Sequence, residues 1–324
     1  MIEKSDTIQK VKQIFIGNPQ ISEILADIAE CREFSDGVLE PDCMIVVGDT
    51  GSGKTTIIDK YLSENSRKEH DEGSVVPILF TTLPPNATPI TASEQLLCDL
   101  GDPFAFQKGK DHVELTKKMV ELMRKCRVEL IIIDEFQHMI DRKNKEVLHS
   151  AADWLKLLIV RSKIPVVLFG MPYSTVILDT NKQLAGRFEL QHKLEPFRVD
   201  NKENVKKYRT FLKYLDDALP FAQRSDLVDK DMMKRIYVFS KGNMRRIRRL
   251  INRASRLAIN EGQESLLLKH FEKVAPKVSR DACTPHNPFS IPVDRLKIEH
   301  PPENVGWENY LIQQDKDVSI DDAF

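Results

Sequence analysis

The segment Gly48-Asp49-Thr50-Gly51-Ser52-Gly53-Lys54-Thr55 constrains the fold most strongly, because it spells a complete GxxxxGK[ST] phosphate loop. An apolar run precedes it at residues 43–47 and a helix-compatible stretch follows at 56–65, as the motif requires. In such a loop the glycines turn backbone N–H groups toward the phosphates, and the new helix directs its positive end at the same anion. We therefore predict that residues Gly48 to Thr56 bind ATP, with Lys54 on the β- and γ-phosphates and Thr55 on Mg2+. The alternative is a chance glycine turn.

Composition narrows the class of protein. The chain has 324 residues, 41% of them hydrophobic, which allows one large or two modest domains with a real core. Its formal net charge of −1 predicts no polyanion binding by itself, although local patches remain open. The five cysteines form no CxxC pair, which argues against a disulfide framework or a thiolate zinc site. No apolar stretch approaches the about 18 residues that span a bilayer, and the N-terminus lacks signal-peptide order, so we expect a cytoplasmic protein without membrane contact.

Hydrophobic periodicity divides the chain into four parts. Residues 1–36 read as an N-terminal helical segment interrupted at Pro19. Residues 37–198 alternate short apolar runs with helical patterns, which predicts an α/β domain with three αβα layers around a parallel five-stranded sheet. The expected strands are residues 44–47, 75–80, 130–133, 166–169 and 190–194.

The last two parts are a lid and a tail. Residues 199–275 have helical periodicity throughout and predict a small all-helical lid, whereas residues 276–324 gather prolines and read as an extended tail. Isolated aromatics in that tail, at Asn287-Pro288-Phe289 and at Trp307 and Tyr310, suit a peptide that docks into a partner protein. The alternative is a tail that packs on its own domain.

A second chemical feature is an apolar strand that ends in two adjacent carboxylates, Asp134 and Glu135. At the carboxyl edge of a nucleotide-binding sheet, Asp134 can hold Mg2+ through its waters. Glu135 is then placed to orient or deprotonate the water that attacks the γ-phosphate. This pair reads as a Walker B motif and favours an ATPase over a kinase; the alternative is that both carboxylates cap the next turn.

The strand at 166–169 is followed by Gly170 and Met171. Oligomeric ATPases usually offer a polar side chain to the γ-phosphate at this strand end, and a methionine cannot do so. Either Ser174 or Thr175 substitutes, or the role is absent.

Two arginine-bearing segments extend the predicted site. Arg187 precedes the last strand, where an arginine can cross a subunit boundary to a neighbour's γ-phosphate as an arginine finger; the alternative is a surface salt bridge. Arg245 and Arg246 open a lid helix, where a basic side chain can fold back over the phosphates and sense the nucleotide. Six arginines between 245 and 256 leave three interpretations open: a solvated face, an interprotomer face or a phosphate-backbone contact.

In this order, these features look like an AAA+ ATPase, and the chain more narrowly resembles the TniB/TnsC transposition regulators of bacterial mobile elements. The resemblance covers about residues 8 to 260 and rests on Ile14-Phe15-Ile16 with Pro19 and on the segments GDTGSGKT, LIIIDEFQHMI, VVLFGMP, QLAGRF and GNMRRIRRL. It implies that Lys54 and Thr55 hold phosphates and Mg2+, Asp134 the metal, Glu135 the water, Arg187 the finger, and Arg246 or Arg245 the lid sensor.

The resemblance also implies a homo-oligomeric ring or helical filament on duplex DNA. Such an assembly links a target-selector protein to the transposase, with ATP hydrolysis controlling assembly. For the DNA contact we expect cations before and along the helix that precedes the Walker B strand, which could follow phosphates without reading bases: Lys108, Lys110, Lys117, Lys118 and Arg124. The alternative is an ordinary solvated helix face.

Two competing functions remain. One is another DNA-associated AAA+ ATPase, such as a replication initiator or a helicase loader. The other is a phosphotransferase, since kinases also carry phosphate loops; it would need an acceptor pocket that the sequence does not reveal.

Overall fold

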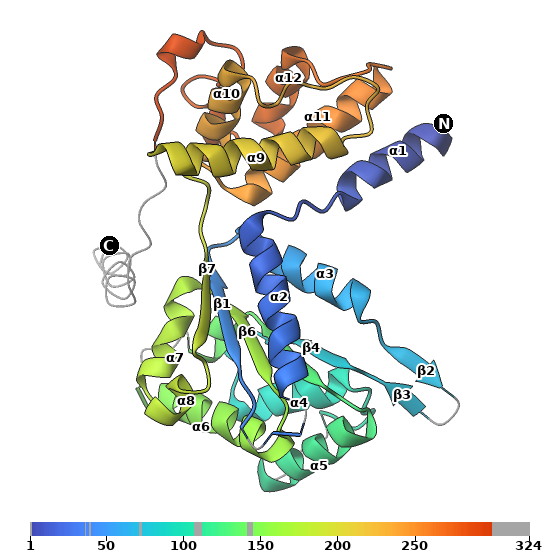
Figure 1. Cartoon of the computed structure of the whole chain (residues 1–324), viewed down its shortest axis with the longest axis vertical. Helices are drawn as coiled ribbons and strands as arrows, with labels where there is room; N and C mark the ends of the chain where they lie inside the picture. Colours follow the sequence, from blue (N-terminus) through green and yellow to red (C-terminus); the bar gives the residue numbers. More distant parts are fainter. Residues whose placement is uncertain are drawn as a thin grey trace, which may run out of the picture. The chain divides into compact units, whose positions relative to one another are not determined.

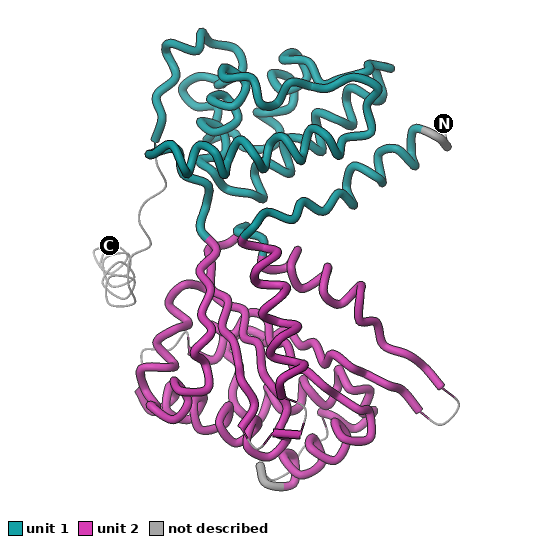
Figure 2. The backbone as a smooth tube through the Cα atoms, in the orientation of Figure 1, with its two compact units in different colours: residues 1–19, 51–53, 195–303 teal, residues 20–50, 54–194, 304–324 magenta. Residues whose placement is uncertain are grey.

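The computed structural model describes residues 2–35, 37–38, 40–70, 73–106, 112–140 and 145–299. The chain forms two compact units, coloured separately in Figure 2. The sheet unit contains residues 20–50 and 54–194, and the helical unit contains residues 1–19, 51–53 and 195–303. Each unit has its own hydrophobic core. Within the described residues, no helix is both long and apolar enough to cross a membrane.

The sheet unit is built on five parallel strands in the order β4-β5-β6-β1-β7. They span Met44–Gly48 (β1), Ile78–Thr82 (β4), Leu130–Asp134 (β5), Val166–Gly170 (β6) and Leu190–Leu194 (β7). This arrangement confirms the predicted parallel five-stranded sheet, and each predicted run contributes residues to one of these strands. Because all strands run the same way, the carboxyl ends of β1, β5 and β6 meet at one edge, where Gly48, Asp134 and Gly170 stand.

Helices cover the sheet on both faces, because strands buried on both sides need apolar partners on each. Ile45, Val47 and Ile133 share a core with the helices on one face. Those helices are α4 (Pro89–Asp99), α5 (His112–Lys125), α6 (Lys145–Ser162), α7 (Val176–Asp179) and α8 (Lys182–Ala185). Two further helices, α2 (Pro19–Phe34) and α3 (Lys54–Glu64), complete the unit (Figure 1). Nε2 of His192 in β7 lies 2.6 Å from the Asp27 carboxylate of α2.

Short elements connect these parts. Two 3-10 turns, η1 (Phe136–Met139) and η2 (Pro172–Thr175), follow β5 and β6. A separate antiparallel hairpin, β2 (Lys68–His70) and β3 (Gly73–Val75), stands between α3 and β4 and was not expected from the sequence.

The helical unit contains α1 (Ile2–Gln13), α9 (Lys202–Ala218), α10 (Lys230–Ser240), α11 (Met244–Asn260), α12 (Leu268–Val278) and the turns η3 (Asp281–Cys283) and η4 (Val293–Arg295). Aromatic side chains fill its core, with Tyr208 edge-on to Tyr237 at 5.6 Å between ring centroids. Asn243 caps α11 by accepting the Arg246 N–H at 3.1 Å. Gly242 precedes this cap at φ +75, and a Cβ there would lie 1.9 Å from the Phe197 carbonyl oxygen, so only glycine fits.

The N-terminal segment, expected as one helical segment interrupted at Pro19, is divided between the two units. α1 belongs to the helical unit, whereas α2 belongs to the sheet unit. The break falls before Pro19, which suits the first turn of a helix because its missing N–H would have no intrahelical partner there. Residues 1–36 are therefore two helices of two different units.

The described part of the tail corrects the prediction of an extended docking peptide that begins at residue 276. Pro276 lies inside α12, and Phe289 is 2% exposed and stacks on Phe271 with centroids 5.4 Å apart. Arg235 holds the same segment by donating to the carbonyls of Pro288 at 2.5 Å and Ile291 at 2.8 Å. A proline-rich composition removes regular helix and strand but not burial, and here an aromatic ring and two hydrogen bonds hold the segment against the core. Trp307 and Tyr310 lie outside the described residues.

Candidate functional site

The phosphate loop connects β1 to α3 at the carboxyl edge of the sheet. Gly51 and Gly53 have φ values of +85 and +111, which L-residues rarely adopt, so the loop curls only because glycine stands there. The ammonium group of Lys54 donates to the carbonyl oxygens of Gly48 and, at 3.2 Å, of Asp49. The lysine thus lies over the loop on which phosphates would sit.

The residues present fit a nucleotide and its metal. Ser52 is 6% exposed, and no described residue accepts or donates a hydrogen bond at its hydroxyl, so a buried donor is available to a phosphate oxygen. Thr55 and Thr56, at the first turn of α3, are exposed and can reach a bound ligand. Oxygen donors of this kind, together with a carboxylate, are what Mg2+ prefers.

Asp134 supplies that carboxylate at the end of β5. It is 6% exposed, and its Oδ1 accepts the Glu135 N–H at 2.8 Å. Burial raises the pKa of Asp134, and the charge of Glu135 raises it further, whereas the hydrogen bond from the Glu135 N–H and the charge of Lys54 lower it. The influence of Lys54 shows that the phosphate-loop lysine and this carboxylate share one electrostatic environment.

Glu135 follows in a left-handed conformation, with φ 55 and ψ 36. A non-glycine residue held there is uncommon and often marks a functional site. The Glu135 carboxylate accepts a hydrogen bond from the side-chain amide of Gln137 and lies 3.8 Å from Nε2 of His138. The backbone strain and the amide together fix the direction of this side chain.

Gln137 is a residue that sequence reasoning missed. It is 5% exposed, and its Oε1 accepts the Met171 N–H at 3.2 Å, so its amide bridges Glu135 and the end of β6. One sequence signal was available: Gln137 is a polar side chain in the η1 turn, directly after Phe136, and both Phe136 and Met139 of this turn are buried. A buried amide needs partners on both ends, and here they are the residues that directly follow β5 and β6.

Met171 offers no polar side chain at the β6 end, as expected. Its Sδ lies 3.9 Å from the Thr50 hydroxyl of the phosphate loop. The Thr175 hydroxyl donates a hydrogen bond to the Pro172 carbonyl oxygen at 3.2 Å. Ser174 is fully buried beneath Gly170, where a Cβ on the glycine would come within 2.4 Å of the Ser174 Oγ. At this strand end, the contact to the Walker B region therefore comes from Gln137 and the Met171 backbone.

Arg187 lies just before β7, at the amino edge of the sheet, away from the phosphate loop of its own chain. Its backbone carbonyl accepts the Cys43 N–H at 2.8 Å, and its Nη2 lies 2.9 Å from Oε1 of Glu40. The arginine side chain is 14% exposed, and the Glu40 side chain is 76% exposed. An arginine finger at this position remains a prediction.

Arg245 and Arg246 are both exposed at the start of α11 in the helical unit. This unit also contains Gly51–Gly53, and the Arg245 N–H donates to the Gly51 carbonyl at 3.1 Å. A Cβ on Gly51 would lie 2.7 Å from the Arg245 Cβ, which gives a second reason for glycine at this position.

The cations predicted to contact DNA have different environments. Lys108 and Lys110 lie outside the described residues. Lys118 forms an ion pair with Asp102. Lys117 and Arg124 are exposed on α5, but Glu114 and Glu121 are exposed on the same helix and alternate with them in sequence. The α5 surface is therefore of mixed charge, and its DNA contact stays a prediction.

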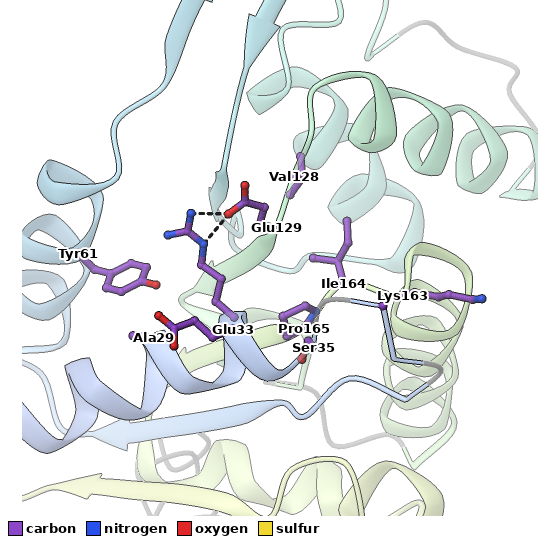
Figure 3. Close-up of a pocket in the computed structure, with 11 residues that line it drawn as sticks. Ala29, Glu33, Ser35, Tyr61, Val128, Glu129, Lys163, Ile164 and Pro165 are labelled. Atoms are coloured by element: carbon purple, nitrogen blue, oxygen red, sulfur yellow. Dashed lines mark hydrogen bonds and ion pairs between the residues drawn. The ribbon is translucent and has the colours of Figure 1, made fainter.

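A cavity of about 630 Å3 lies at the amino edge of the sheet, between α2, α3 and the segments that precede β5 and β6 (Figure 3). Arg32 pairs there with Glu129, with Nε 2.7 Å from Oε2, and its Nη1 donates to Asn65 at 2.6 Å. Burial raises the pKa of Tyr61 in this cavity, against the hydrogen bond with Arg32 that lowers it. The cavity is thus at the edge opposite the phosphate loop and is separate from the candidate nucleotide site.

Comparison with known families gives one match over most of the chain. The family described as "Bacterial TniB protein" matches residues 7–198, which include the phosphate loop, Asp134, Glu135 and Arg187. A curated relative, the ORC1-type DNA replication protein 1 of Sulfurisphaera tokodaii, is 22% identical over 245 residues, which are 75% of this chain and 58% of that protein. The chain therefore spans less than two thirds of that relative's length.

Solved structures share the fold at low sequence identity. Cdc6p of Pyrobaculum aerophilum gives a TM-score of 0.56 at 14% identity and covers 83% of this chain and 70% of its own. ORC1 of Aeropyrum pernix in complex with DNA gives a TM-score of 0.55 at 16% identity and covers 82% of this chain and 67% of its own. ORC2 of the same organism, in ADPNP–ADP complexes, gives a TM-score of 0.54 at 14% identity and covers 83% of this chain and 71% of its own. These likenesses confirm the AAA+ fold with its helical C-terminal region.

Proposed function

Because this chain belongs to the bacterial TniB family, we propose that it is an ATPase that assembles on duplex DNA and couples target-site selection to a transposase. The observation that carries this proposal is the carboxyl edge of the sheet, where the Lys54 loop, the buried Asp134 and the fixed Glu135 come together from β1 and β5. These are the parts that γ-phosphate hydrolysis requires: a phosphate cradle, a metal carboxylate and a base for water.

The roles of the residues follow from their positions. Lys54 exchanges its carbonyl partners for the β- and γ-phosphates, while the loop from Gly48 to Thr56 surrounds the anion with N–H groups. Thr55 and Asp134 hold Mg2+, which neutralises charge on the phosphates. Glu135 takes the proton from the attacking water as that oxygen bonds to the γ-phosphorus and the bond to the ADP oxygen breaks.

Gln137 acts through Glu135 and is a positioning residue. Its amide donates to the Glu135 carboxylate and is itself anchored on the Met171 N–H, so the base cannot swing freely into solvent. Preorganisation of this kind is effective because a small misplacement of a catalytic group costs much of its contribution.

Arg187 and the lid arginines complete the site. Arg187 stands at the edge opposite its own phosphate loop, so a guanidinium at this place serves the nucleotide of a second copy in a ring or filament. Its Glu40 partner is largely exposed, so replacement of this carboxylate by a phosphate leaves the Arg187 charge paired and the Glu40 charge in solvent. Arg246 or Arg245 senses the nucleotide from the start of α11.

Electron microscopy of the full chain tests the proposal. The chain is imaged with and without duplex DNA, each time with ATP, a slowly hydrolysed analogue or ADP. Rings or filaments that form only with DNA and a triphosphate together support it. A chain that stays monomeric in every condition contradicts it.

A second candidate is a replication initiator, which the likeness to the ORC1-type protein favours. DNA sequence dependence separates the two. A regulator that contacts only the phosphate backbone of DNA binds duplexes of unrelated sequence with similar affinity, whereas an initiator prefers its origin sequence.

A further inference from the structure

Helix α11 has an unusual charge composition. It contains six arginines and no acidic residue over Met244–Asn260, whereas each other described helix of eight or more residues carries at least one aspartate or glutamate. Its apolar residues, such as Ile247, Leu250 and Ala254, are fully buried in the core of the helical unit. The arginines are not part of this core, so their contacts with other residues decide what each of them does.

One of the six is structural. Arg248 is partly buried and donates from Nη2 to the carbonyls of Val11 at 3.2 Å and Ile14 at 3.0 Å, so it holds the end of α1. Burial lowers the pKa of Arg248 below its usual value. This arginine is committed to the fold and is not available to a ligand.

The other five lie on the solvent face of the helix: Arg245, Arg246, Arg249, Arg253 and Arg256. None of their side chains forms a hydrogen bond or an ion pair with another described residue. Some exposed cations of the same unit do have acidic partners, for example Lys207 with Glu203 and Arg224 with Asp217. Like charges three or four residues apart on a helix repel, so the arginines on this face destabilise the isolated helix.

The residue that follows α11 and the helix α1 supply little of the missing negative charge. Glu261, directly after α11, is already engaged by Lys269 and Lys273. From α1, the ammonium group of Lys4 donates to the Asn260 carbonyl at the end of α11. The remaining described charges on α1 are Asp6, Lys10 and Lys12, so cations prevail there too.

We propose that Arg249, Arg253 and Arg256 bind the phosphate backbone of duplex DNA, with Arg245 and Arg246 left for the nucleotide. This inference rests on the proposed function and names its DNA-contacting surface. A helix rises about 1.5 Å per residue, so these three guanidinium groups extend over roughly 10 Å, the axial rise of about three nucleotides of one strand. Arginine forks bind phosphate oxygens in pairs, and backbone contacts of this type carry no base specificity.

Fluorescence anisotropy of a short labelled duplex, titrated with the full chain over a series of salt concentrations, tests the proposal. The test variant replaces Arg249, Arg253 and Arg256 with glutamine. The matched control replaces Lys206, Arg209 and Lys213, three exposed cations of α9 in the same unit, with glutamine. Both variants lose the same charge, so a net-charge effect would weaken them equally.

We expect the arginine variant to bind DNA at least about tenfold more weakly, with a slope of log K against log salt that is shallower by about 2 to 3. The control should stay within about twofold of the parent. Binding of a fluorescent ATP analogue should be unchanged in both variants. If the triple variant does not fold, the single change Arg253→Gln replaces it in the test. Its slope of log K against log salt should be shallower than that of the parent by about 1.

Different failures have different meanings. If the parent chain itself does not bind duplex DNA, the proposed function fails. If the parent binds and the arginine variant keeps the same affinity and slope, or weakens only as much as the control, the proposal is overturned and the α11 face serves another partner, such as an acidic protein surface.

Discussion

The two edges of the central sheet use charged residues in opposite ways. At the amino edge, Arg32 is held by Glu129 and Asn65, and Arg187 is held by Glu40. At the carboxyl edge, Glu135 is held in a left-handed conformation, and buried hydroxyl groups at Ser52 and Ser174 have no hydrogen-bond partner among the described residues. Satisfied groups stabilise a fold, whereas strained or unsatisfied groups are retained where a ligand completes them. At the amino edge the same criterion separates Arg32, whose groups are satisfied, from Arg187, whose Nη1 is buried without a hydrogen-bond partner among the described residues.

The largest expected effect is at Lys54. Lys54→Ala should weaken ATP binding by at least about a hundredfold, because the cation that reaches two phosphates is lost. Titration with a fluorescent ATP analogue measures this. Lys60→Ala, on the same helix and paired with Glu64 at its surface, is the control and should bind ATP normally. Near-parental affinity in the Lys54 variant would remove the loop from the nucleotide site.

Glu135→Gln should keep ATP binding and lower turnover by about a hundredfold or more, since it removes the base but not the phosphate cradle. Slow hydrolysis should also prolong the DNA-bound assembly. Steady-state phosphate release and sedimentation with DNA measure the two consequences. Unaltered turnover would assign the water-activating role to another residue.

Gln137→Leu should lower kcat by roughly tenfold with KM within about twofold, because it releases Glu135 without touching the phosphates. The split between kcat and KM distinguishes positioning from a general loss of structure. Gln183→Leu, an exposed glutamine on α8, is the control and should leave both parameters unchanged. A rise in KM at constant kcat would contradict the positioning role.

The smallest effect belongs to the amino edge. Arg32→Leu should reduce the free energy of unfolding by about 1 kcal/mol, as expected for a partly exposed ion pair, and leave turnover unchanged. Chemical denaturation and phosphate release measure the two quantities. Loss of activity in a stable Arg32 variant would show that the amino edge contributes to chemistry within its own chain.

Much of the fold was predictable because its signals are local. Apolar runs of strand length predicted all five strands of the sheet, and the glycine pattern with Lys54 predicted the phosphate loop. The bridge from Glu135 through Gln137 to Met171 was not predictable, because it joins residues 34 positions apart that meet only when β5 and β6 pair. Likewise, the burial of Phe289 depends on Phe271 and on α10, not on the composition of its own segment.

Mixing two inactive variants tests most directly whether the two edges meet between copies. Lys54→Ala keeps Arg187 but cannot hold ATP, whereas Arg187→Ala holds ATP but lacks the finger. Each variant alone, in the presence of duplex DNA, should hydrolyse ATP slowly. The account predicts that turnover rises when the two are mixed, because the Lys54→Ala chains supply Arg187 to the nucleotide sites of their neighbours. Co-assembly of both variants on DNA with turnover no higher than the sum of the separate rates would contradict it.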